Sequence, residues 1–310
     1  MKINKIGSGR YADCFRITDG HQSVIVKLGY YRENTLREFA RYMKSGRGQR
    51  ARQMKNSDAI QIGNAFGVLT NRLIERAVSP HFVYVYANVD GKHLAQKFGS
   101  MIPERMRSAT PVQLKYNNLS FLEQFDSDLT QWLRRGRTVN DESVRIAIFG
   151  VLYTLAALQH VYPNFRHNDL STNNVLIKRY RTPRTFQYKI GRLQFTMTTP
   201  SLVALTDYDF VHIPHILENE RVASGKYRVT PCKNNAYDSH FFLKTVQRVL
   251  HARRNLPETK AFLASLPFHK EDRNDTLQVP GMDPMTLLQH PYFSKLRGRP
   301  RAGVVTYTFS

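Results

Sequence analysis

The stretch Arg166-His167-Asn168-Asp169-Leu170-Ser171-Thr172-Asn173-Asn174-Val175-Leu176-Ile177 decides how this chain folds. It has the pattern H-x-D-L-x-x-x-N followed by three apolar residues, so that Asp169 and Asn174 share one loop ahead of an expected strand. A polar turn between a helix and a strand is also rich in Asn and Ser, which is an ordinary explanation for the composition. Asp followed by Asn at this spacing, however, offers a proton acceptor beside an oxygen ligand for Mg²⁺, the two groups that phosphoryl transfer needs. The flanking sequence decides between these interpretations.

Apolar residues upstream of this loop recur at helical spacing from Val144 to Leu158. Asn140 is placed to cap this helix, and Asp141 and Glu142 would lie in its first turn, where negative charge is favourable. The sequence therefore predicts a helix that ends just before the loop.

Two glycines near the N-terminus, Gly7 and Gly9, are followed by the apolar run Ser23–Val26 and then by Lys27. Glycine permits positive φ angles and a close approach of backbone N–H groups to an anion, so G-x-G suits a hairpin over phosphates. A G-x-G alone usually marks only a turn. A hairpin followed by a lysine on an apolar strand is more specific, and it predicts a nucleotide-binding half.

Helices and strands alternate between these landmarks. Residues 33–43 and 60–74 favour helices, and the Gly/Arg-rich break at 45–52 between them indicates an exposed insertion. Strands are predicted at Val83–Tyr86 and at Leu119–Phe125, and the second runs into a short polar link.

A strongly basic segment, 178–192, follows the loop, and strands are expected as far as Leu205. The sequence D-Y-D-F comes next. Asp207 follows the apolar strand immediately, and Asp209 would be a cap or turn residue. Asp238 is expected to open a further helix.

These motifs together resemble those of eukaryotic-type protein kinases through most of the chain. The resemblance implies an α+β fold with a small β-rich N-lobe over about residues 1–122, a hinge at 123–128 and a larger, mainly helical C-lobe over about 129–296. Residues 297–310 would form a basic tail. The implied activity is transfer of the γ-phosphoryl group of ATP to protein hydroxyls, with Mg²⁺ as the metal.

The resemblance also implies roles for single residues. Asp169 would be the catalytic base and Lys27 would hold the α/β-phosphates, while Asn174 and Asp207 would bind Mg²⁺. Asp238 would be the buried aspartate that supports the catalytic loop.

For the nucleotide, Gly7 and Gly9 would cover the phosphates, and backbone groups of Glu123 and Phe125 would contact adenine. The helix glutamate that pairs with Lys27 in kinases is harder to place. We choose Glu38 for this role, and Glu75 is the alternative. Either could instead be a solvated surface glutamate, which is the commoner position of glutamate on helices.

One subgroup fits best, the serine/threonine kinases of large nucleocytoplasmic DNA viruses, which are distant relatives of the haspin type. The similar features are H-N-D-L in the loop, the basic strand pair after it, D-Y-D-F in place of D-F-G, S-P-H-F before a strand, and Y-D-S-H-F-F-L.

The chain also departs from the kinase pattern. Ala12 replaces the third glycine, and Asn168 replaces the arginine that usually pairs with an activation-loop phosphate. Ser171 stands where serine/threonine kinases commonly have a lysine, and the A-P-E signature is absent. Asn168 and the missing A-P-E signature indicate a kinase that is not switched on by loop phosphorylation, and Ser171 leaves open whether the acceptor is serine/threonine or tyrosine.

The net charge of the chain is +22, with a sequence pI near 10.1. Such a surface attracts polyanions, including nucleic acid, anionic lipid and acidic or phosphorylated protein substrates, although a solvated surface without a dedicated partner has the same composition. Arg297-Gly298-Arg299-Pro300 is the core of an AT-hook, so we expect DNA contact through Arg297 and Arg299.

The two cysteines, Cys14 and Cys232, make no zinc spacing and no disulfide framework, which indicates a reducing compartment. We find no apolar run long enough to span a bilayer and no signal peptide. The expected location is therefore intracellular rather than secreted, in host cytoplasm or a virion if the protein is viral.

Two other functions remain open from the sequence. A small-molecule phosphotransferase of the aminoglycoside or choline kinase type shares the loop and a metal aspartate, but the two-glycine hairpin and the Asp238 helix argue against it. A pseudokinase that binds nucleic acid through its charge would not require Lys27, Asp169, Asn174 and Asp207 together.

Overall fold

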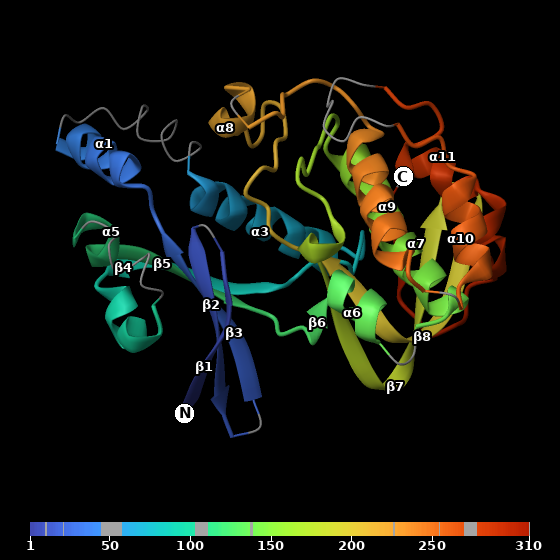
Figure 1. The fold of residues 1–310 in the computed structure, drawn as a ribbon, viewed down its shortest axis with the longest axis horizontal. Coiled ribbons are helices and arrows are strands. Elements are labelled where there is room, and N and C mark those ends of the chain that lie inside the picture. Colours follow the sequence, from blue (N-terminus) through green and yellow to red (C-terminus); the bar gives the residue numbers. More distant parts are fainter. Residues whose placement is uncertain are drawn as a thin grey trace.

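The computed structural model describes residues 1–9, 11–20, 22–44, 58–102, 111–136, 139–225, 227–253, 255–269 and 278–309. These residues form an α+β fold with two sheets and a group of helices (Figure 1), which confirms the predicted class. The strands are β1 (Lys2–Ser8), β2 (Ala12–Asp19), β3 (Gln22–Tyr30), β4 (Val85–Lys92), β5 (Tyr116–Leu122), β6 (Ser127–Asp128), β7 (Val175–Ile190), β8 (Leu193–Leu205) and β9 (Thr306–Phe309). The helices are α1 (Glu33–Lys44), α3 (Ala59–Glu75), α5 (Pro111–Lys115), α6 (Leu129–Arg135), α7 (Asp141–Val161), α8 (Glu220–Ala223), α9 (Tyr237–Leu250), α10 (Pro257–Ala264) and α11 (Pro284–Gln289), with 3₁₀ turns η1 (Leu94–Met101), η2 (Thr172–Asn174) and η3 (Pro291–Leu296).

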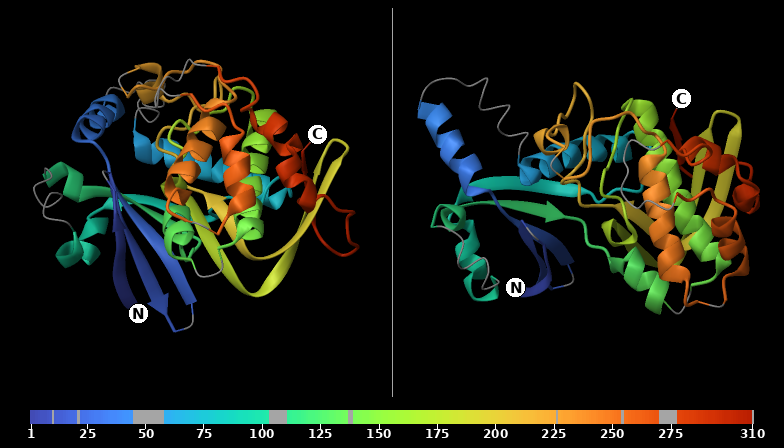
Figure 2. Two further views of the ribbon diagram at one scale, coloured as in Figure 1. Left: turned by 45° about the vertical axis from the view of Figure 1, so that its right-hand side comes forward. Right: turned by 45° about the horizontal axis from the view of Figure 1, so that its top comes forward.

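The N-terminal sheet has five antiparallel strands in the order β1-β2-β3-β5-β4. Its own core forms where Phe15 of β2 stacks on Phe98 of η1, with ring centroids 4.3 Å apart, beside the buried Val26 and Leu28 of β3. Figure 2 shows this sheet and the helices α7, α9 and α10 on opposite sides of the molecule. Lys27 follows Val26 on the central strand, so the sheet fixes where the lysine lies.

Helix α7 is the centre of the second and larger core. Its capping box is formed by Asn140 and Ser143, each of which binds the backbone of the other, so the predicted cap is confirmed. Contrary to the prediction from sequence, α7 is long and apolar enough to cross a membrane. However, 78% of its most apolar window is buried inside the protein, as in an ordinary core helix.

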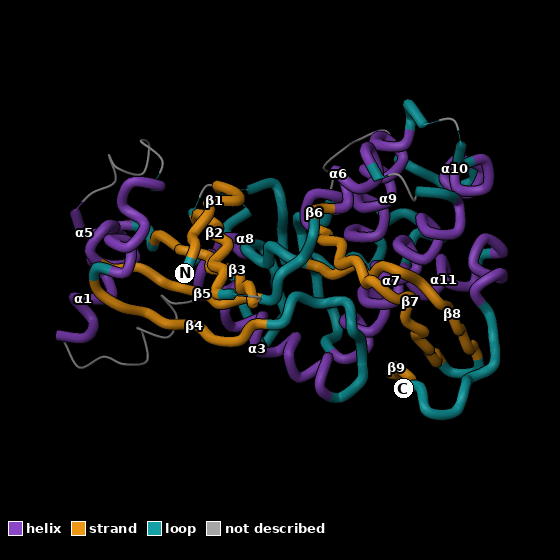
Figure 3. Tube along the Cα trace, turned by 90° about the horizontal axis from the view of Figure 1, so that it is seen from below, coloured by secondary structure: helices purple, strands orange, loops and turns teal. Residues whose placement is uncertain are grey.

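The second sheet is dominated by the long hairpin of β7 and β8, which confirms the strands predicted after the loop. The segment expected as a basic tail lies against this hairpin (Figure 3), and β9 pairs with β7 in parallel. Gly298 donates its N–H to the Gln194 carbonyl at 3.2 Å, and the Arg301 N–H donates to the Gln187 side chain at 2.9 Å. The Arg297, Arg299 and Arg301 side chains are exposed on this anchored backbone.

Helix α3 lies between the N-terminal sheet and the helices (Figure 1), and Phe66 on it packs in the larger core. The strand predicted at Val83–Tyr86 starts later, since β4 runs from Val85 to Lys92. The predicted break at 45–52 lies outside the described residues.

Gly150 allows α7 to pack closely on the segment before β4. A Cβ at Gly150 would lie 2.7 Å from both His81 Cε1 and Val203 Cγ2, closer than such atoms approach. Gly150→Ala should gain about 1 kcal/mol of helix propensity but lose more through overpacking, so we expect the free energy of unfolding to fall by about 1–2 kcal/mol. Urea denaturation measures this. Gly63→Ala in α3 is the control, since its Cβ would meet nothing within 4 Å; a Gly150 variant as stable as the Gly63 variant would contradict the packing argument.

His81 should make the protein sensitive to acid. Its Nδ1 donates to the Val203 carbonyl at 2.8 Å and its Nε2 accepts from the Tyr188 hydroxyl at 2.9 Å, so the neutral ring is satisfied. Burial lowers the pKa of His81 from 6.5 to about 4, although the Val203 carbonyl opposes this. Because the unfolded chain binds the proton first, stability should fall by about 1.4 kcal/mol per pH unit below pH 6.5, down to about pH 4. Urea unfolding of wild type and His81→Gln from pH 7 to 4.5 tests this; parallel curves for the two proteins would contradict it.

Candidate active site

The loop after α7 brings Asp169 and Asn174 together. Asn174 donates its side-chain N–H to the Asp169 carbonyl at 2.7 Å, and the same nitrogen lies 3.4 Å from the Asp169 carboxylate. The Asp169 side chain is exposed, as a group that meets a substrate must be. Because the Asn174 side-chain nitrogen faces Asp169, the side-chain oxygen is the Asn174 atom that could bind a cation.

Asp238 at the start of α9 supports this loop through hydrogen bonds to its backbone, as predicted. Its carboxylate is 1% exposed and accepts the backbone N–H groups of His167 at 2.7 Å and Asn168 at 2.9 Å. Asn168 has φ +67°, a left-handed conformation that Asn tolerates better than most residues. Its side chain donates to the Phe210 carbonyl at 2.9 Å, which ties the loop to the segment after β8.

Asp207 is positioned next to Asn174 through backbone contacts. β7 and β8 pair Val175 with Leu205, and the Thr206 N–H donates to the Asn174 carbonyl at 3.1 Å. The Thr206 carbonyl accepts from His167 Nε2 at 3.0 Å. Asp207 itself has a left-handed backbone conformation, with φ +62°.

Asn174 and Asp207 fit a magnesium ion. Both present oxygen atoms from neighbouring strand ends, and Mg²⁺ prefers one or two protein oxygens completed by water and phosphate. No three His, Cys, Asp or Glu side chains gather into a metal site anywhere in the part of the chain that the structure describes. A cation here would therefore depend on nucleotide phosphates for the rest of its ligands.

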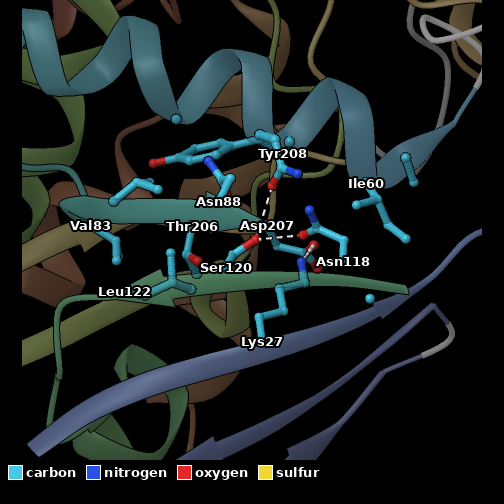
Figure 4. A pocket seen from close by; sticks show the side chains of 16 residues that line it. Lys27, Ile60, Val83, Asn88, Asn118, Ser120, Leu122, Thr206, Asp207 and Tyr208 are labelled. Carbon is cyan, nitrogen blue, oxygen red and sulfur yellow. Dashed lines mark hydrogen bonds and ion pairs between the residues drawn. The ribbon is translucent and has the colours of Figure 1, made fainter. Parts of the chain in front are cut away.

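Lys27 lies next to Asp207 (Figure 4). Its Nζ is 3.9 Å from the Asp207 carboxylate and 4.0 Å from the Asp209 carboxylate. Burial alone would lower the pKa of Lys27, but the charges of Asp209 and Asp207 outweigh it, so the pKa is raised and the ammonium stays protonated. The cavity beside Lys27 is lined by Asp207, by strand residues of the N-terminal sheet and by α3.

Asp209 is a site residue that the sequence interpretation missed. It was expected to be a cap or turn residue, yet its side chain is only 19% exposed and faces Lys27. Burial raises the pKa of Asp209, while the Lys27 charge opposes this. No local sequence signal distinguishes such an aspartate from a turn residue.

The predicted phosphate hairpin forms between β1 and β2, but the conformational reason given for its glycines was wrong. Neither Gly7 nor Gly9 has a positive φ, and the Gly9 N–H donates to the Ala12 carbonyl at 2.7 Å. A Cβ at Gly7 would lie 3.9 Å from Cys14 Cβ, and one at Gly9 would lie 3.5 Å from the Ala12 carbonyl oxygen, so packing does not require glycine at either position. Asp13 stiffens the hairpin by accepting from Ser8 at 2.7 Å.

The predicted adenine contacts lie on the link from β5 to β6. The Glu123 N–H donates to the Tyr84 carbonyl at 2.9 Å, so its carbonyl is the backbone group it can offer adenine. The Glu123 carboxylate accepts a hydrogen bond from the Lys178 ammonium. Phe125 is buried beside Val83.

The side chain of Glu38 lies outside the described residues. The alternative, Glu75, lies at the far end of α3 and accepts from the Tyr84 hydroxyl at 2.8 Å. It makes no ion pair with Lys27.

Two buried arginines hold the segment between Asp207 and α9, and no sequence pattern indicated this role for either. Arg166 donates to the Thr230 and Cys232 carbonyls at 3.1 and 3.0 Å. Arg221 lies 5.1 Å from the Tyr11 ring centroid and 4.3 Å from that of Phe210, so it joins the hairpin to this segment.

Two comparisons agree with this geometry. Residues 133–275 match the sequence profile of the poxvirus serine/threonine protein kinase family. A protein of Acanthamoeba polyphaga mimivirus named "Putative serine/threonine-protein kinase" is 30% identical over 129 residues, which cover 38% of this chain and 28% of that protein. Residues 133–275 are therefore similar to the poxvirus serine/threonine protein kinases, and the chain also resembles a mimivirus protein that bears a kinase name.

Proposed function

We propose that this protein is an ATP-dependent kinase that transfers the γ-phosphoryl group to serine or threonine hydroxyls of proteins. The observation that supports it most is the loop in which Asn174 bonds Asp169 while Asp238 accepts two backbone N–H groups. Both similarities fall on kinases, and the chain spans about 28% of the length of the mimivirus protein. On this proposal residues 1–122 are a nucleotide-binding N-lobe, 123–128 a hinge and 129–296 a C-lobe, with 297–310 as an appended basic segment.

In the proposed reaction Asp169 orients the acceptor hydroxyl and receives its proton as the oxygen bonds to the γ-phosphorus of ATP. The bond from that phosphorus to the β–γ bridging oxygen breaks, and ADP leaves. Lys27 binds the α/β-phosphates of ATP, and Gly7 and Gly9 cover them. Mg²⁺, when held by Asn174 and Asp207, neutralises charge on the phosphates.

The test offers ATP labelled at the γ-phosphate to wild type, Asp169→Ala and Asp207→Asn. The acceptors are a basic protein, the acidic protein casein and an aminoglycoside. Transfer to protein that both substitutions abolish supports the proposal, and preference for casein would support acidic substrates, which the +22 charge favours. Transfer to the aminoglycoside alone would favour the small-molecule phosphotransferase. If wild type transfers no phosphate but still binds DNA, the result favours the pseudokinase.

DNA binding is a second proposed function, supported by the exposed Arg297, Arg299 and Arg301 on an anchored backbone. A mobility-shift titration should show affinity falling steeply with salt, and alanine at the three arginines should reduce that slope. A matched control replaces Lys2, Lys97 and Arg134 by alanine, since these residues are exposed and lie outside the 297–301 segment. Equal slopes for both triple variants would count against a DNA site at the arginines. Since both similarities are to viral proteins, we also propose that the protein acts inside the host cell or in the virion.

A further inference from the structure

Among the described residues, the carboxylates beside Lys27 come from the segment after β8 and not from a helix. In the kinase template a glutamate on the helix after the lysine strand forms the ion pair that holds the lysine toward the phosphates. Here the carboxylates within 4.0 Å of Lys27 Nζ, among the described residues, are those of Asp207 and Asp209.

Helix α3 offers no carboxylate where it faces Lys27. The α3 residues that line the cavity with Lys27 include Gly63, Asn64 and Gly67. The carboxylates at its two ends are engaged elsewhere. Asp58 caps the helix through the Ile60 N–H at 3.0 Å, and Glu75, as described above, bonds Tyr84.

Asp209 is better placed than Asp207 to serve as a permanent partner. Its side chain is 19% exposed, against 44% for Asp207, so its attraction to Lys27 is less screened by water. Its backbone is also fixed, because the Asn219 side chain donates to the Asp209 carbonyl at 3.0 Å.

We propose that Asp209 is the positioning residue for Lys27 and takes the place of the helix glutamate. The proposal rests on the proposed kinase function. It assigns separate duties to the two aspartates: Asp207 serves the metal ion, and Asp209 keeps the Lys27 ammonium directed into the nucleotide site while Asp207 is occupied.

A double-mutant cycle on ATP binding tests this proposal. Dissociation constants for a fluorescent ATP analogue are measured for wild type, Asp209→Asn, Lys27→Met and the double variant. We expect Asp209→Asn to weaken binding about tenfold in the wild-type background and less than twofold in the Lys27→Met background. An equal loss of ATP affinity in both backgrounds would mean that Asp209 does not act through Lys27 and only supports the fold of its segment. That result would overturn the proposal.

Further variants sharpen the result. Gly63→Glu supplies a glutamate from α3 where a Cβ has open space, and it should restore binding to Asp209→Asn at least in part. If the effect of Glu38→Gln on ATP binding disappears in the Lys27→Met background, while the effect of Asp209→Asn does not, Glu38 is the partner of Lys27 and the proposal is overturned. The exposed Glu142→Gln is the control and should bind ATP as wild type does.

The binding assay separates this proposal from the kinase function. If wild type binds ATP but transfers no phosphate, the kinase function is lost while the cycle still decides the role of Asp209. If wild type binds no ATP, both proposals fail.

Discussion

Asp169→Asn should reduce phosphoryl transfer about a thousandfold while ATP affinity changes little. In the proposed reaction the substitution removes the proton acceptor for the attacking hydroxyl, and positioned bases contribute about 10²–10⁴-fold to rates. It keeps the backbone carbonyl that Asn174 bonds at 2.7 Å, so the loop should remain formed. Single-turnover transfer from labelled ATP and equilibrium nucleotide binding measure the two effects.

The control for Asp169 is Asn173→Ala, an exposed position in the same loop, which should transfer phosphate at nearly the wild-type rate. Retention of more than a tenth of the activity by Asp169→Asn would remove Asp169 from the role of base. A large fall in ATP affinity would instead indicate that Asp169 acts in nucleotide binding.

Asp238→Ala should cost both stability and activity. It leaves the backbone N–H groups of His167 and Asn168 buried without their acceptor, at about 1–3 kcal/mol each. We therefore expect the free energy of unfolding to fall by about 2–5 kcal/mol and transfer to be nearly abolished, because the loop that positions Asp169 loses its support.

A graded series tests this account of Asp238. Asp238→Asn keeps one acceptor oxygen but turns a donor toward the second N–H, so it should fall between wild type and Asp238→Ala in urea unfolding and in transfer rate. Equal stability of wild type and Asp238→Ala would show that these two hydrogen bonds contribute little.

Features of the site that depend on neighbouring residues were predictable from the sequence. The Asn140 cap and the apolar stripe of α7 follow from helix periodicity, and both were confirmed. The spacing of Asp169 and Asn174 similarly placed them in one loop, and the structure joins them by a hydrogen bond. Such features are predictable because the backbone geometry of a helix or short loop determines which nearby side chains meet.

Some contacts of the site could be named from the sequence only through the resemblance to kinases. Asp238 reaches the loop from 71 residues away. Nothing in its local sequence shows that its carboxylate accepts two N–H groups, and the resemblance supplied that role. The resemblance also led us to expect a helix glutamate for Lys27; the Glu38 side chain lies outside the described residues, so that expectation stays a prediction.

The sequence by itself determined the α+β class, the order of the main elements and the loop that brings Asp169 to Asn174. Only the tertiary structure decided that Asp209 faces Lys27, that Arg221 joins the Tyr11 hairpin to the segment after β8, and that Gly7 and Gly9 need no positive φ. The physical reason is that periodicity and turn chemistry are properties of adjacent residues. The partner of a buried charge is instead set by which strands and helices pack together, and a lysine accepts any carboxylate that packing brings within reach.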